Sequence, residues 1–325
     1  MQTTSDWYRR AATRDLAGLS AVHVSWATGI ADDAEVIGLI DTLPSAKRHP
    51  SLVFSVAVYL GAPRDADYAP FRAWLLEEWG RVAELATSST TQTNEAGRCV
   101  PLLLALDRLD GPLALLELGA AAGLCLVPDR YSYDLGGTVL GDGSPRLSAE
   151  ITGEEASGNA AEARIPRSLP EIVWRRGVDL TPLDARSPDD RRWLESLVPP
   201  DRTDRLERLR AALDTVALDP PTIIEADATD VLEALLDSVP EGATPVVVAL
   251  GTLVYLPGPQ RQRVLDLAAS TGAHLVTLEG AGVLTEVHDR LAGRAVPEDM
   301  PTVLSLDRQP LAFSNPHGDR LQLIG

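Results

Sequence analysis

The hydrophobic pattern divides the chain into two parts. Up to about residue 110, apolar residues recur at helical spacing or in long runs, and the alternation of a half-buried strand is missing. We expect helices over residues 6–19, 32–44, 51–61, 69–86 and 94–109. Residues 1–110 are therefore predicted to form a largely helical N-terminal region that caps the pocket of the remainder.

From residue 111 onward, short apolar runs that end in turn residues alternate with helical patterns. The runs at 112–119, 222–228, 245–251 and 273–280 suit strands buried on both faces. Strands that alternate with helices indicate βαβ units and a parallel sheet. Residues 111–325 are thus predicted to form an α/β domain that ends in an antiparallel edge hairpin. A segment at about 135–170, rich in Gly, Ser, Pro and Ala, is predicted to be an insertion, either a lid or a plain surface loop.

Composition narrows the classes of partner. The chain has 325 residues, 45% of them hydrophobic, and a net charge of -18. Such an acidic surface repels phosphate backbones and anionic lipid, so we expect neither nucleic acid nor membrane as a partner, although an acidic proteome alone gives the same bias. With no signal-peptide pattern and no long apolar span, the protein is expected to be cytoplasmic. Cys99 and Cys125 are predicted to be buried free thiols, and no metal-ligand spacing occurs.

The stretch LLELGAAAG carries the candidate chemistry. It places an acid at the tip of a buried strand, directly before a turn of small residues: Glu117, Gly119, Ala121 and Gly123. A dinucleotide fingerprint would need Gly at positions 121 and 124, and a P-loop would need Lys followed by Ser or Thr. The pattern resembles the first motif of Rossmann-like S-adenosylmethionine-dependent methyltransferases, with Ala in place of the middle Gly. The alternative is a tight turn that binds nothing.

Two later acids extend this interpretation. Asp179 ends a predicted strand, where its carboxylate would accept hydrogen bonds from both ribose hydroxyls of a nucleoside. Asp134 competes for that role because its spacing from Glu117 is closer to the usual one. Asp227, with Ala228 beside it, follows a third strand and resembles the acid that meets the adenine amino group in such enzymes. Either Asp179 or Asp227 could instead be an ordinary helix N-cap.

Several segments together resemble the actinobacterial family DUF2332, namely TTQTNEAGRCVPLL, LLELGAAAGLCLVPDRYSYD, WRRGVDLTPLDARSPDDRRWLESLV and LVYLP. The resemblance spans almost the whole chain. It implies a helical N-terminal region joined to a methyltransferase-like Rossmann domain. Members of the family often carry a histidine at the end of the fourth strand, where this chain has Ala249, Leu250 and Gly251. This departure puts in doubt any mechanism that uses that histidine as a base.

Methyl transfer needs a base only when the nucleophile arrives protonated. We assign catalytic roles to Glu95 in QTNEAGR, to His317 in the predicted terminal turn, and to Tyr255 in LVYLP. Glu279, at the tip of the last predicted parallel strand, is a second option for the base. The substrate-binding candidates lie in two polar patches and are Thr93, Asn94, Arg98, Arg130 and Tyr131. Each patch could also be structural, as a capped helix start or as aromatic packing with a solvated Arg.

The sequence thus predicts an S-adenosylmethionine-dependent methyltransferase that acts on a small molecule. Two alternatives stay open. One is a non-catalytic nucleoside-binding or regulatory protein on the same fold, and the other is an enzyme that uses the same pocket for cyclisation or isomerisation. The oligomeric state, including a homodimer, is also left open.

Overall fold

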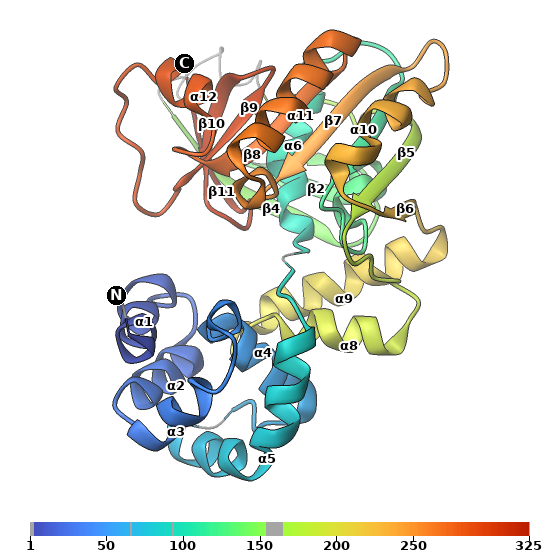
Figure 1. Cartoon of the computed structure of the whole chain (residues 1–325). Coiled ribbons are helices and arrows are strands. Elements are labelled where there is room, and N and C mark those ends of the chain that lie inside the picture. Colours follow the sequence, from blue (N-terminus) through green and yellow to red (C-terminus); the bar gives the residue numbers. More distant parts are fainter. Residues whose placement is uncertain (1–2, 66, 93, 154–164, 325) are drawn as a thin grey trace. The chain divides into compact units, whose positions relative to one another are not determined.

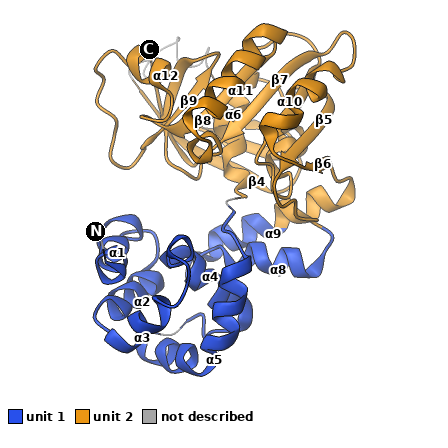
Figure 2. Cartoon of the chain, viewed as in Figure 1, with its two compact units in different colours: residues 1–93, 186–210 blue, residues 94–185, 211–325 orange. Residues whose placement is uncertain are grey.

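The computed structural model describes residues 3–65, 67–92, 94–153 and 165–324. They form two compact units, which Figure 2 shows in different colours. Unit 1 comprises residues 1–93 and 186–210, and unit 2 comprises residues 94–185 and 211–325. Residues 94–110, assigned above to the helical region, therefore belong to unit 2, while a later segment belongs to unit 1. That the helical region caps a pocket stays a prediction.

The described part of unit 1 is helical, as the hydrophobic pattern predicts. Its elements are α1 (Thr4–Arg10), the π-helix η1 (Ala11–Asp15), α2 (Ala21–Ala31), α3 (Ala34–Ile40), η2 (Ser45–Lys47), α4 (Pro50–Leu60), α5 (Tyr68–Ser88), α8 (Pro188–Ser196) and the first half of α9 (Thr203–Leu218). Helix α2 lies within the predicted helical region, in which His23 was expected to be helical but no bounds were assigned to its helix. It is rich in β-branched residues and contains Gly, which are weak helix formers. Its cap is Ser20, whose hydroxyl accepts a hydrogen bond from the backbone N–H of His23 at 3.0 Å.

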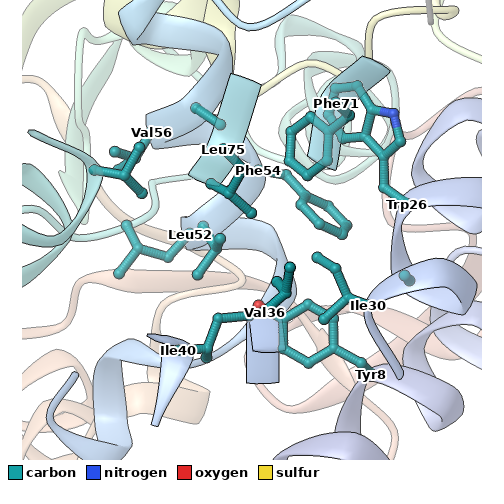
Figure 3. Close-up of a cluster of buried hydrophobic side chains, with 14 of the residues drawn as sticks. Tyr8, Trp26, Ile30, Val36, Ile40, Leu52, Phe54, Val56, Phe71 and Leu75 are labelled. Carbon is teal, nitrogen blue, oxygen red and sulfur yellow. The ribbon is translucent and has the colours of Figure 1, made fainter. Parts of the chain in front are cut away.

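An aromatic core holds unit 1 together (Figure 3). Trp26 and Phe71 stack with ring centroids 4.0 Å apart, and Phe54 meets both rings edge-on. Tyr8 packs against Phe54 from α1. Helix α4 passes through this core, which explains why its sequence is apolar on nearly every side: eight of its eleven residues are buried.

Unit 2 contains one sheet, seen in Figure 1, with the order β3-β2-β4-β11-β10-β9-β8-β7-β1-β5-β6. The strands are β1 (Leu113–Leu118), β2 (Ser132–Leu135), β3 (Thr138–Leu140), β4 (Arg146–Thr152), β5 (Ile172–Asp179), β6 (Thr222–Glu225), β7 (Thr244–Leu250), β8 (His274–Gly280), β9 (Thr302–Leu306), β10 (Gln309–Ser314) and β11 (Arg320–Leu323). The sheet and its helices confirm the predicted mixed α/β class.

Parallel and antiparallel pairing divide this sheet. Strands β6, β5, β1, β7 and β8 pair in parallel, and β8–β9, β9–β10 and β10–β11 pair antiparallel. The predicted C-terminal antiparallel hairpin is therefore present, but it does not form the edge of the sheet. Strand β11 pairs with β4, and β4 and β3 come from the predicted insertion. Residues 154–164 of that insertion lie outside the described part of the chain.

Helices cover the parallel strands. Side chains from α10 (Ala228–Asp237), α11 (Gly258–Thr271) and α12 (Thr285–Arg290) form one cluster with Leu116 and Leu118 of β1. Strand residues alternate between faces, so Glu117 points away from that cluster. The fully buried helix α6 (Cys99–Leu106) packs against β4, β8, β9 and β10. None of the described helices is long and apolar enough to cross a membrane.

Candidate functional site

The strand order changes direction between β1 and β7. Among the parallel strands, β5 and β6 lie on one side of β1, and β7 and β8, which follow them in the chain, lie on the other side. In an open α/β sheet, ligands bind outside the carboxyl ends of the strands at such a switch point. The turn Gly119–Gly123 follows β1, and Asp179 ends β5. The topology thus brings together the two sequence features on which the predicted site depends.

The turn after β1 has an unusual backbone. Gly119, Ala121 and Gly123 all have positive φ, at 74°, 48° and 76°. The N–H groups of Gly119 and Ala120 both donate to the carbonyl of Val178, at 2.8 and 3.1 Å. Left-handed backbone costs an L-residue with a Cβ roughly 1–2 kcal/mol, so Ala121 carries strain that glycine would not. The alternating small residues therefore meet a backbone requirement of the turn.

Replacing Ala121 by glycine should relieve this strain. We expect Ala121→Gly to raise the free energy of unfolding by about 1 kcal/mol, measured by chemical denaturation. Ala122→Gly is the matched control, because Ala122 is buried in the same turn but has no positive φ. The control should lose about 0.5–1 kcal/mol through the greater freedom of the unfolded chain. A loss of stability in Ala121→Gly would contradict the strain.

Asp179 fastens the end of β5 to this turn. Its Oδ2 accepts a hydrogen bond from the N–H of Ala121 at 2.8 Å, and its Oδ1 accepts one from the N–H of Thr181 at 2.9 Å. The backbone N–H of Leu183 donates to the carbonyl of Ala121 at 3.1 Å. Asp179 thus ties the end of β5 to the β1 turn. The ribose role of Asp179 stays a prediction.

Glu117 has a buried carboxyl group. The residue is 4% exposed, and its Oε2 has no hydrogen-bond partner. Burial is the largest cause that raises its pKa well above the ordinary value, and Cys125 and Asp179 raise it further. The guanidinium of Arg98 opposes these effects. A buried acceptor without a donor is costly, which makes this atom a candidate for contact with a ligand.

Residues 94–98 contact the β1 turn and two neighbouring segments. The side-chain N–H of Asn94 donates to the carbonyl of Ala120 at 3.3 Å, while its Oδ1 is buried without a hydrogen-bond partner. Arg98 donates through Nη1 to the carbonyl of Leu250 at 2.5 Å and through Nε to that of Pro316 at 3.0 Å. This segment therefore links the β1 turn, the carboxyl end of β7 and the loop between β10 and β11.

Glu95 and His317 lie together although 222 positions separate them in sequence. Their facing atoms, Oε2 of Glu95 and Nδ1 of His317, are 3.7 Å apart. The Oε1 atom of Glu95 accepts a hydrogen bond from the N–H of Gly97 at 3.1 Å. A β-carbon at Gly97 would overlap the backbone oxygen of His317, and one at Gly318 would overlap the backbone oxygen of Gly97. Two glycines thus allow the close backbone approach that pairs the two predicted catalytic residues.

The loop after β7 is held against the end of β1. The N–H groups of Thr252 and Leu253 both donate to Oε1 of Glu279, at 2.8 and 2.7 Å. The hydroxyl of Thr252 donates to the carbonyl of Leu118 at 2.8 Å, and a β-carbon at Gly119 would overlap that hydroxyl. Burial raises the pKa of Glu279, against the effect of its backbone donors. Sequence reasoning missed Thr252, whose only signal was its place next to a glycine at the end of a strand.

Other predicted residues have structural partners. Asp227 is the N-cap of α10, where its Oδ1 accepts from the N–H and hydroxyl of Thr229 at 2.8 and 2.7 Å, and Ala228 is the first residue of that helix. Asp134 binds the N–H of Gly137 and the side chain of Arg146, within its own group of strands. The adenine role of Asp227 stays a prediction, and the helix-cap alternative raised above is observed.

Arg130 and Tyr131 also have structural partners. Arg130 donates to the backbone and side chain of Asp219. Tyr131 is fully buried, and its hydroxyl donates to the carbonyl of Leu124 at 2.8 Å. Tyr255, in η7 (Leu253–Tyr255), is 81% exposed just after β7. Thr93 lies outside the described residues. The substrate roles of Arg130 and Tyr131 and the catalytic role of Tyr255 stay predictions.

A surface hollow elsewhere in unit 2 does not carry the predicted chemistry. It lies beside α11 and is lined by Arg261, Glu286 and Arg308, among others. Arg261 donates to three backbone carbonyls, and Arg308 pairs with Glu286 at 3.0 Å. Its charged groups are thus satisfied within the chain.

Comparison with known families gives one match. The model of the family described as "Uncharacterized protein conserved in bacteria (DUF2332)" matches residues 5–322. The match covers nearly the whole chain, so the chain belongs to this family and the resemblance seen in the sequence is confirmed. A search of curated proteins gave no match.

Proposed function

We propose that this member of the DUF2332 family binds S-adenosylmethionine at the carboxyl ends of β1 and β5 and transfers its methyl group to a small molecule. One observation carries the proposal above the others. The left-handed turn Gly119–Gly123 lies at the switch point of the sheet and is held by Asp179 of β5. Directly before the turn, in β1, lies the buried Glu117, whose Oε2 has no hydrogen-bond partner. This arrangement offers acceptors and a closely approachable backbone to a nucleoside.

The same turn is poorly suited to phosphate. Phosphate sites on α/β folds use the N-terminus of the α-helix that follows the first strand. Here, in the described part between β1 and β5, the turn leads only into the short 3₁₀ segments η4 (Leu124–Leu126) and η5 (Pro128–Arg130) and then into strands. The carboxylate of Asp179 adds negative charge rather than donors. These features favour a phosphate-free, cationic cofactor over a nucleoside phosphate or a dinucleotide.

The residues present fit such a cofactor. Asp179, at the carboxyl end of β5 beside the turn, would accept hydrogen bonds from the ribose hydroxyls. Oε2 of Glu117 and Oδ1 of Asn94 are buried acceptors that would take donors from the ligand. When bound, S-adenosylmethionine supplies an electrophilic methyl group and a neutral leaving group. The chain then has to orient the acceptor and keep water out.

Calorimetry with purified full-length protein tests this proposal. We expect saturable binding of S-adenosylmethionine and of S-adenosylhomocysteine, and much weaker binding of ATP and NAD. Asp179→Asn should weaken the binding of S-adenosylmethionine at least about ten-fold, since one of its two anionic acceptors is replaced by a donor. Asp219→Asn is the matched control, because Asp219 binds Arg130 outside the turn.

Circular dichroism of both variants checks that they are folded. Equal affinity in Asp179→Asn and the wild type would contradict the placement of the cofactor at β5. Failure of the folded wild type to bind S-adenosylmethionine would contradict the proposed function as a whole.

A further inference from the structure

Glu95 and His317 place a carboxylate opposite an imidazole, with Oε2 and Nδ1 3.7 Å apart. The side chains are 7% and 14% exposed, so both groups are mostly shielded from water. Glu95 is fixed by the N–H of Gly97, and the close approach of Gly97 and Gly318 fixes the backbone that carries each partner. Packing of this kind limits the freedom of the imidazole ring to turn.

The pair also lies next to the proposed cofactor turn. The thiol of Cys125, in η4, donates to the backbone carbonyl of Glu95 at 3.6 Å. Asn94, directly before Glu95, reaches the carbonyl of Ala120 within the turn, at 3.3 Å. Arg98 ties the loop of His317 to the end of β7 through Pro316 and Leu250. The chain thus holds the imidazole and the turn in one framework within unit 2.

We propose that His317, positioned by Glu95, removes the proton of a hydroxyl acceptor during methyl transfer, so that the natural substrate is an alcohol or a phenol. This inference rests on the proposed function and names its substrate class. As the acceptor attacks, its O–H bond breaks and the proton moves to Nε2 of His317, while its oxygen gains the methyl group. The electrons of the broken sulfur–carbon bond stay on sulfur, and the carboxylate of Glu95 balances the imidazolium.

The class of methyl acceptor follows from whether the acceptor must lose a proton before or during its attack. A hydroxyl group is a weak nucleophile until it loses its proton, so its attack gains from a base in contact. A neutral amine attacks with its lone pair and loses a proton only afterwards, and a carboxylate needs no base. A shielded His–carboxylate pair beside the site is therefore most useful for an oxygen nucleophile.

Charged groups lie on the elements around His317. Glu95 faces its imidazole, and Arg98 donates to the carbonyl of the preceding residue, Pro316. Asp319 follows in the same loop, Arg320 begins β11, and Glu150 of β4 pairs with Arg320 at 3.7 Å. Of these, Glu95 is the group whose carboxylate faces Nδ1, so its neutralisation should have the largest effect on His317.

The first test measures how Glu95 affects the pKa of His317. Nuclear magnetic resonance of histidine-labelled full-length protein gives the pKa of His317, identified by the signal that His317→Asn removes. We expect Glu95→Gln to lower this pKa by about one unit, because a facing carboxylate favours the charged imidazole. The other histidines should titrate as in the wild type. An unchanged pKa of His317 would overturn the pairing, whether or not a cofactor binds.

The second test uses two probe acceptors of equal size, phenol and aniline, with saturating S-adenosylmethionine. We expect methyl transfer to phenol, and a loss of at least about 100-fold in His317→Asn with unchanged cofactor affinity. His288→Asn, a change at an exposed histidine of α12, should keep the wild-type rate. Transfer to aniline alone, or no transfer to phenol while the cofactor is bound, would overturn the inference. Absence of cofactor binding would instead contradict the proposed function.

Discussion

Higher stability together with lost binding of S-adenosylmethionine is the expected result of Glu117→Gln. The free energy of unfolding should rise near neutral pH, because the amide has no proton to take up on folding. The affinity for S-adenosylmethionine should fall at least about 100-fold, because the amide has one acceptor oxygen fewer and cannot ionise when the cationic cofactor binds. A residue that costs stability and is needed for a ligand is typical of a functional site.

The direction of this stability change follows from the pKa of the Glu117 carboxyl group. Burial raises the pKa of Glu117 well above that of the unfolded chain, with Arg98 as the opposing cause. The protonated carboxyl therefore contributes stability below the unfolded pKa, and this contribution is lost as the pH rises, because the unfolded chain then releases the proton more easily. Glutamine does not titrate, so the advantage of the variant should be larger near pH 8 than near pH 5.

Guanidinium denaturation at both pH values and calorimetry measure the two effects. Glu241→Gln is the matched control, since Glu241 is exposed in the turn before β7 and should change neither quantity. An unchanged affinity for S-adenosylmethionine would remove Glu117 from the binding site. Lower stability at both pH values would show that its ionised form is the one stabilised by the fold.

Unit 1 should lose stability in mild acid because of one buried histidine. His23 packs between Trp26 and Phe54, with ring centroids 5.4 and 5.0 Å away, and its Nε2 has no hydrogen-bond partner. Burial lowers its pKa from 6.5 to about 4, although Asp201 acts in the opposite direction. Between these values the unfolded chain binds a proton that the folded chain does not. The resulting loss should reach about 2 kcal/mol between pH 7.5 and pH 5, and about 3 kcal/mol below pH 4.

Comparison with His23→Phe isolates this contribution. Phenylalanine keeps an aromatic ring in the core and removes both the titration and the unsatisfied nitrogen. Chemical denaturation from about pH 7.5 to about pH 5 should show a smaller loss in the variant than in the wild type, by about 2 kcal/mol. Parallel curves for the two proteins would contradict the lowered pKa of His23. Other titrating groups cancel in the difference, because both proteins share them.

The sequence was most informative where one local pattern has one structural outcome. The unbroken apolar run of β1 can be buried only on both faces, and its six residues are indeed all buried. The run over 51–61 was long enough for a buried helix, and α4 is one. The bounds of α2 could not be predicted, because packing around Trp26 overrides the weak helix propensity of its residues. Asp227 shows the limit of a motif, since an acid after a strand also caps a helix.

By itself the sequence determined the helical first part, the alternating strands and helices of the second, and the acid before a turn of small residues. These features depend on contacts between near neighbours, which a local pattern records. Only the tertiary structure decided that residues 186–210 join unit 1, that β11 pairs with β4, and that Glu95 meets His317. Each of these depends on residues far apart in the chain, brought together by the burial of apolar surface, which is non-directional. A hydrophobic pattern therefore predicts that a residue is buried, but not which partner it meets.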